Sequence, residues 1–99
     1  MSQQKTNWVV GMTRKASKGK DNLPLEIQIT FLALFALLQA HGPTQPRWPH
    51  YGKLEGKKDT YHCHLNRGRP TYVVIWHILD KDQKIMEVQY VGTHENAPY

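Results

Sequence analysis

Apolar and polar positions alternate in the last forty residues of the chain in a pattern typical of β-strands. Residues 60–65, 71–79 and 85–91 are rich in β-branched and aromatic side chains, which favour strands. The connections at 66–70 and 80–84 have hairpin lengths and contain turn-forming residues. We therefore expect three successive strands that form an antiparallel meander.

The first half of the chain predicts one strand and one helix. Residues 8–13 form a short apolar run that predicts a first strand, whereas the charged, glycine-containing segment 14–22 is typical of a loop. Residues 25–40 place apolar side chains at helical spacing over a length that favours a helix. Asn22 is a suitable cap for this helix, and Pro24 suits its first turn.

Two segments complete the predicted architecture. Residues 43–52 contain three prolines, which excludes a helix or central strand and predicts an ordered loop. Residues 53–59 form a turn-rich lead into the meander. The fold class is therefore α+β, with two layers built from an N-terminal strand, a helix and an antiparallel meander. Within the helix, residues 31–38 are apolar nearly all round, which predicts cover on more than one side, either by the sheet and a loop or by a partner chain.

Length, charge and composition limit the classes of function that fit this chain. The 99 residues suffice for one domain, 1–99, whose polar start at 1–7 is expected to be disordered. Thirteen Lys and Arg against eight Asp and Glu give a net charge of +5, which favours a polyanionic partner, although many small basic proteins bind nothing specific. A single cysteine and no apolar run near membrane-spanning length predict a cytoplasmic protein with no membrane association.

Histidines supply the candidate chemistry. His62 and His64 share one face of their predicted strand, and Cys63 lies on the other. Together with His94, the two strand histidines could in principle hold zinc, but no carboxylate or paired-cysteine motif supports this alternative, so no metal or other cofactor is expected. Cys63 is interpreted as a small buried apolar residue and not as a nucleophile. Imidazole and cationic side chains together favour RNA, since they can move protons and bind phosphates.

Several motifs resemble the RelE/ParE superfamily of toxin–antitoxin toxins, with YafQ-like and RelE-like mRNA interferases nearest. The resemblance covers residues 25–99, and its most specific parts are the Cys63-His64 pair and the ending that contains Gly92, His94 and Tyr99. It also includes Gly42-Pro43, Leu54-Glu55-Gly56 and Tyr61-His62-Cys63-His64-Leu65. His62 stands where that branch has a carboxylate.

The resemblance implies a type II toxin, a cytotoxic translational repressor that cleaves mRNA on the ribosome without metal and is silenced by a cognate antitoxin. It makes His94 the general acid or base, Tyr99 the aromatic that stacks on or orients the nucleotide, and His64 the strand histidine. Cleavage through the 2′-OH also needs cations at the phosphorane, for which Arg67 and Arg69 are the candidates. The predicted RNA-binding residues are Lys15, Lys18, Lys20, Lys57, Lys58 and His62.

Two other functions fit the same fold. One is a ParE-like toxin that targets gyrase, and the other is a non-catalytic RNA-binding or interaction module. The remaining histidines, His41, His50 and His77, are interpreted as scattered surface or core residues.

Overall fold

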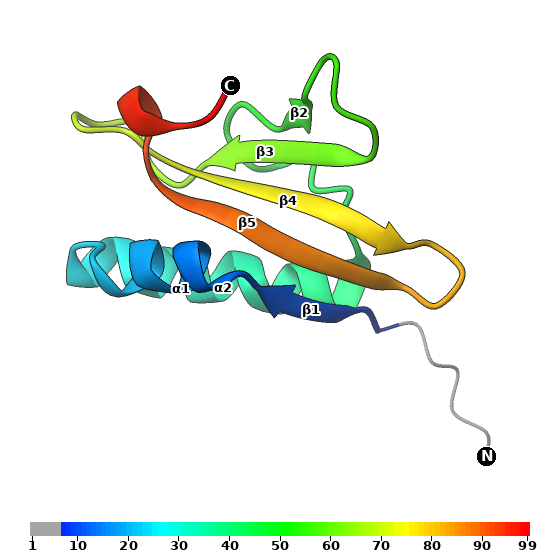
Figure 1. The fold of residues 1–99 in the computed structure, drawn as a ribbon. Helices are drawn as coiled ribbons and strands as arrows, with labels where there is room; N and C mark the ends of the chain where they lie inside the picture. The colour runs from blue at the N-terminus through cyan, green and yellow to red at the C-terminus, as the bar shows by residue number, and fades with distance from the viewer. Residues whose placement is uncertain (1–6) are drawn as a thin grey trace.

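A computed structural model describes residues 7–99, which form a five-stranded sheet with both helices on one face (Figure 1). The strand order is β1-β5-β4-β3-β2. The elements are β1 Val9–Met12, α1 Arg14–Asp21, α2 Leu25–His41, β2 Gly52–Lys53, β3 Thr60–His64, β4 Tyr72–Asp80, β5 Ile85–Thr93 and the 3-10 helix η1 His94–Asn96.

The predicted meander is confirmed. β3 pairs antiparallel with β4, and β4 pairs antiparallel with β5, with bounds one or two residues from those expected. The predicted first strand is β1, which pairs parallel with β5 so that Val9 lies opposite Ile85. The α+β class predicted from the sequence is therefore correct.

The prediction of a loop at residues 14–22 was wrong, because this segment contains the helix α1. The Thr13 side chain accepts a hydrogen bond from the Ala16 backbone N–H and caps the helix, while Ala16 is fully buried. Gly19 lies directly on the β5 backbone, since a Cβ there would collide with the carbonyl oxygen of Val91. Tertiary packing of these two small residues against the sheet therefore stabilises a helix that its composition does not favour.

The start of α2 also differs from the prediction. Asn22 is the C-terminal cap of α1, and Pro24 precedes α2 and donates no side-chain cap. The amide of Gln28 donates to the carbonyls of Asp21 and Leu23, which connects α2 to the end of α1. At the other end, Gly42 adopts a φ of 92° and leaves no room for a side chain beside the Trp8 indole.

The proline-rich segment wraps around the edge of the sheet as an ordered loop. Gln45 is buried and its amide donates to the carbonyls of Leu37 and Gly42. The Pro49 carbonyl accepts from the His64 backbone N–H at 2.8 Å. Gly52 and Lys53 had been predicted as loop and lead-in, but they form the short strand β2, because they pair with His62 and Tyr61 of β3.

The two faces of the sheet are covered by different parts of the chain. Under the helices lies the main core, which includes Trp76, Phe31, Leu34 and Cys63. The opposite face carries a small second core of Val73, Ile75, Tyr90 and Leu54, against which Ala97 of the C-terminal segment packs. The C-terminal segment therefore lies on the face away from the helices (Figure 1).

Two further expectations concern the chain as a whole. Disorder was expected in residues 1–7, of which only Asn7 lies within the described residues. No helix in residues 7–99 is long and apolar enough to cross a membrane.

Candidate functional site

The end of β3 and the end of the chain meet on the face of the sheet away from the helices. Because side chains alternate along β3, Cys63 enters the main core while His62 and His64 lie on the other face. The His64 and His94 rings have centroids 5.3 Å apart, and Tyr99 lies 5.1 Å from His62 and 5.8 Å from His94. The fold thus brings together four of the predicted site residues.

His50 joins this group, although the sequence interpretation treated it as a scattered histidine. Its ring stacks on His64 with a centroid distance of 4.2 Å. The His50 backbone has a φ of 56°, in the left-handed region, and it lies between two fixed neighbours. Pro49 is hydrogen-bonded to β3, and Tyr51 stacks on the aromatic rings of the main core. No motif signalled this contact, because it depends on how the proline-rich loop folds over the sheet.

The other two histidines set aside in the sequence lie outside the cluster. His41 ends α2 and is exposed. His77 lies on β4, where its Nδ1 is 2.9 Å from the Thr60 hydroxyl. For these two residues the prediction of a structural or surface position holds.

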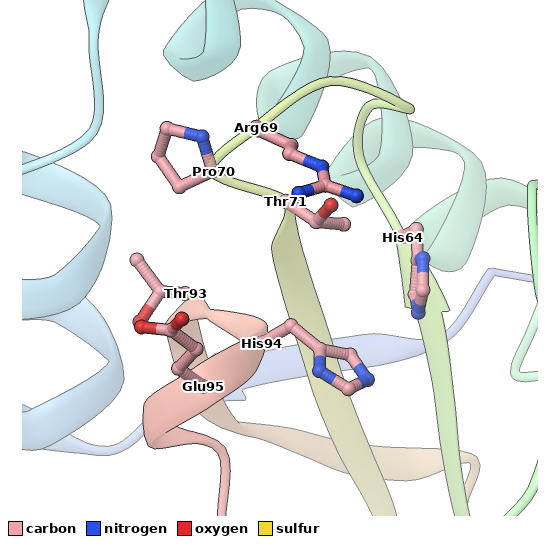
Figure 2. Close-up of a pocket in the computed structure, with 7 residues that line it drawn as sticks. All are labelled: His64, Arg69, Pro70, Thr71, Thr93, His94 and Glu95. Carbon is pink, nitrogen blue, oxygen red and sulfur yellow. The ribbon is translucent and has the colours of Figure 1, made fainter.

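A pocket of about 350 Å³ opens between the meander loop and the start of η1 (Figure 2). The loop at 66–71 is ordered, because the Asn66 side chain accepts from the Tyr72 N–H and donates to the Pro70 carbonyl. This order places the Arg69 guanidinium at the same opening as the His64 and His94 imidazoles. The lining residues are His64, Arg69, Pro70, Thr71, Thr93, His94 and Glu95.

Burial and crowding keep the strand histidines neutral. Desolvation, followed by the nearby His50, His94 and His62, lowers the pKa of His64 from 6.5 to about 4. Desolvation, with His50 and His94, also lowers the pKa of His62. Both imidazoles are therefore uncharged near neutral pH, and each can accept a proton.

The two weak acids of the region stay protonated. Burial raises the pKa of the Tyr99 phenol, with smaller contributions from Cys63 and Tyr90. Burial also raises the pKa of the Cys63 thiol to about 12. Cys63 is fully buried, which confirms its interpretation as a small core residue. A protonated thiol without solvent access is no nucleophile, whereas the phenol of Tyr99 can donate a proton.

His62 carries an unpaired buried atom. Its Nδ1 is shielded from solvent and has no hydrogen-bond partner among residues 7–99. The imidazole stands where a carboxylate was expected from the family resemblance, so the described site lacks a fixed negative charge at that position. An uncharged imidazole at this position cannot stabilise a charged histidine as a carboxylate would.

The predicted cationic residues divide into three groups. Arg69 lines the pocket, whereas Arg67 is exposed on the same loop. Lys15, Lys18 and Lys20 lie on α1, where Lys15 Nζ is 5.9 Å from the Tyr90 ring centre and Lys20 pairs with Asp21 at 3.2 Å.

The other two lysines are more remote. Lys57 and Lys58 are exposed in the turn that leads into β3. They lie at the opposite end of this strand from His64, so the fold does not bring them to the pocket. A second groove of about 310 Å³ shares Thr93 with the histidine pocket and continues toward Gly19 and Asn22 at the end of α1. The helix that carries Lys15, Lys18 and Lys20 therefore borders a groove that adjoins the pocket.

The zinc alternative finds no geometric support. Across residues 7–99 no group of three or more His, Cys, Asp or Glu side chains is arranged so that it could hold a metal ion. The His62 and His64 ring centroids are 6.4 Å apart and the rings are tilted against each other. The arrangement places a neutral imidazole, a second imidazole and a guanidinium around one opening, and the Tyr99 phenol lies beside the second imidazole.

Solved structures provide the comparison that relates this arrangement to known proteins. Searches with the sequence against protein-family models and curated proteins find no match. The structure is similar to the archaeal RelE–RelB complex from Pyrococcus horikoshii OT3, with a TM-score of 0.72 and 22% identity over 92% of this chain and 99% of that one.

The chain has the RelE fold. The E. coli RelBE toxin–antitoxin complex matches with a TM-score of 0.68 and 16% identity, over 90% of this chain and 99% of the other. A metal-bound toxin from Helicobacter pylori matches with a TM-score of 0.58 and 21% identity, over 89% and 96% of the two chains. The RelE-like architecture expected from the sequence is confirmed. The structure adds one helix, α1, that the sequence did not predict.

Proposed function

We propose that this protein is the toxin of a type II toxin–antitoxin system and that it cleaves mRNA on the ribosome, in the cytoplasm, without a metal. The observation that carries the proposal is the convergence of His64, His94 and Arg69 around one pocket, with the Tyr99 ring 5.8 Å from the His94 ring. The RelE fold supports the toxin class, because the similar solved structures are RelE toxins in complex with RelB antitoxins.

The residues divide the reaction between them. The neutral His64 accepts the proton of the ribose 2′-OH, whose oxygen attacks the adjacent phosphorus. Arg69 stabilises the additional negative charge on the phosphorane. The bond to the 5′-oxygen then breaks, and His94 or Tyr99 supplies the proton to this leaving oxygen. The products are a 2′,3′-cyclic phosphate and a free 5′-hydroxyl, and no oxidant or cofactor is consumed.

Binding of RNA relies on cations and stacking. Tyr99 lies beside His62 and His94 and is 48% exposed, so part of its ring is accessible to a nucleotide base. Lys15, Lys18 and Arg67 are exposed and can bind neighbouring phosphates, as the net charge of +5 favours. Lys57 and Lys58 would contact more distant phosphates or ribosomal RNA.

Cleavage of a defined mRNA on programmed ribosomes tests the proposal. His94→Ala should lower the cleavage rate on the order of 100-fold, the usual effect of losing a general acid or base. His41→Ala, which removes an exposed histidine at the end of α2, is the matched control and should retain full activity. A folded His94→Ala protein that cleaves like wild type contradicts the mechanism. Inhibition of gyrase supercoiling without RNA cleavage would support the ParE-like function instead.

The cognate antitoxin is the proposed protein partner. Leu25, Ile29 and Leu32 form an exposed stripe on α2, being 73%, 62% and 57% exposed. Their spacing of four and three residues places them on one side of the helix. A segment with apolar anchors and acidic side chains would cover this stripe and neutralise the basic surface.

Co-expression with a neighbouring reading frame for a small DNA-binding protein tests this partner. A stable complex that inhibits cleavage is expected, and Ile29→Lys should weaken it. Leu79→Lys, at an exposed leucine on β4, is the control and should leave the complex intact. Absence of a complex, or equal effects of the two variants, would contradict this interface.

A further inference from the structure

Tyr90 makes a contact that reaches the reacting region although it does not line the histidine pocket. It lies near the end of β5 on the face away from the helices and is only 7% exposed. Its hydroxyl donates a hydrogen bond of 2.7 Å to the backbone carbonyl of Thr93. This carbonyl belongs to the peptide group that joins Thr93 to His94.

The other end of the same peptide group is also held. The His94 backbone N–H donates to the Thr71 carbonyl, which directly precedes β4, at 2.8 Å. The peptide plane before His94 is therefore fixed from two sides, by a tyrosine of β5 and by the backbone next to β4. At this point the chain leaves β5 and begins η1, so the orientation of this peptide sets the direction in which the His94 imidazole projects.

Packing fixes the position of the Tyr90 hydroxyl. The ring lies in the small core with Val73 and Ile75. Gly92 leaves the space that the hydroxyl occupies, since a Cβ at this position would lie 2.7 Å from the hydroxyl oxygen. Lys15 Nζ lies 5.9 Å from the ring centre on the side of α1. A hydroxyl fixed in this way can hold its acceptor with little freedom.

We propose that Tyr90 is a positioning residue that aims the His94 imidazole at the pocket through the peptide between Thr93 and His94. The inference rests on the proposed function, because it assigns Tyr90 a role in the proton transfer given to His94. Proton transfer requires donor and acceptor within hydrogen-bond reach, and displacements of about 1 Å can lower rates by on the order of 100-fold. The peptide has two anchors, the Tyr90 hydroxyl and the Thr71 carbonyl, and loss of one should shift the imidazole less than loss of both.

Tyr90→Phe removes the hydroxyl and keeps the ring, so it tests the anchor without opening the small core. We expect kcat for ribosome-dependent cleavage to fall about 10-fold with KM unchanged, because the contact orients a catalytic group and binds no RNA. Tyr61→Phe is the matched control, since it removes a half-buried hydroxyl on the helix-covered face. It should leave kcat unchanged.

A structural readout separates this inference from the proposed function. The imidazole resonances of His94, assigned by their loss in His94→Gln, should shift in Tyr90→Phe and stay in place in Tyr61→Phe. If wild-type protein cleaves and Tyr90→Phe has the same kcat, the inference is wrong. If wild-type protein does not cleave, the proposed function fails, and an unshifted His94 resonance would overturn the positioning role as well.

A second variant displaces the hydroxyl from the other side. Gly92→Ala places a methyl group against the Tyr90 hydroxyl, so it should lower kcat and shift the same His94 resonances. If Gly92→Ala leaves both unchanged, the hydrogen bond does not position His94. If Tyr90→Phe lowers the yield of folded protein, Gly92→Ala still tests whether the Tyr90 hydrogen bond positions His94.

Discussion

Cys63 and His64 are neighbours on β3, and the same physical cause acts on both with opposite chemical results. Desolvation disfavours the charged form of each group, so the pKa of Cys63 rises to about 12 and that of His64 falls to about 4. For the thiol, the neutral form is unreactive. For the imidazole, the neutral form is the base that a proton transfer needs. Burial therefore keeps the Cys63 thiol protonated and the His64 imidazole unprotonated.

The two faces of the sheet explain why this difference persists. The helix-covered face closes over Cys63 and Trp76, both of which are fully buried. The other face carries the small core with Leu54 and Ala97, and His50 stacks on His64 there, so His64 remains half-buried beside a pocket. The larger core thus lies on one face of the sheet and the candidate site on the other.

The largest expected effect is on the stability of the helix-covered face. Trp76→Ala removes a fully buried indole that also donates to the Pro43 carbonyl. The free energy of unfolding, measured by chemical denaturation, should fall by about 3–5 kcal/mol. Leu79→Ala, at an exposed position on the same strand, should change it by less than about 0.5 kcal/mol. Similar losses in both variants would contradict the proposed division between the faces.

A smaller effect is expected from pH on the histidine face. The unfolded chain binds a proton at His64 as the pH falls through 6.5, whereas the folded chain binds it only near pH 4. The unfolded state thus holds more protons between these values, so the free energy of unfolding should decrease as the pH is lowered from 6.5 to 4. His62 acts in the same direction.

His64→Gln should reduce this dependence on pH, because Gln does not titrate. Denaturation curves recorded at several pH values between 4 and 7.5 provide the measurement. Near pH 7.5 the free energy of unfolding should not change with pH through His64 in either protein. If the free energy of unfolding changes equally with pH in wild type and variant, His64 is not desolvated.

Cys63→Ala sharpens the comparison of neighbouring residues. The substitution creates only a small cavity in the main core, so the free energy of unfolding should decrease by about 1 kcal/mol. Cleavage should continue at the wild-type rate, since the thiol lies on the opposite face from His64. Loss of cleavage in a protein that remains folded would assign Cys63 a role in the chemistry.

The smallest effect is expected from metal removal. Treatment with a strong chelator should leave both Tm and the cleavage rate unchanged, because the proposed proton transfers use imidazole and phenol groups. Ribosomes need magnesium, so the chelator is applied to the toxin and removed before the assay. A decrease in activity that zinc restores would revive the cluster of His62, His64 and His94 as a metal site.

Local pattern was sufficient for much of the fold. The three strands of the meander and the helix α2 were predictable, because strand alternation, turn residues and helical spacing are encoded within a few neighbouring positions. The placement of His62 and His64 on one face and of Cys63 on the other followed from the same alternation, whereas only the tertiary structure decided that the helices cover the Cys63 face. The resemblance of the chain's last residues to the RelE/ParE superfamily, and not local pattern, indicated His94 and Tyr99 as candidate site residues.

Other features required the tertiary structure, because they depend on contacts between distant segments. The segment of α1 looks like a loop by composition, and it becomes a helix because Ala16 and Gly19 pack on β5. His50 enters the site only because its loop crosses the edge of the sheet and stacks it on His64. The anchor from Tyr90 to Thr93 likewise depends on how β5 ends above the small core. The sequence thus predicted the meander, β1 and α2 and named the candidate site residues, while packing between distant segments decided that α1 and β2 form and which side chains meet.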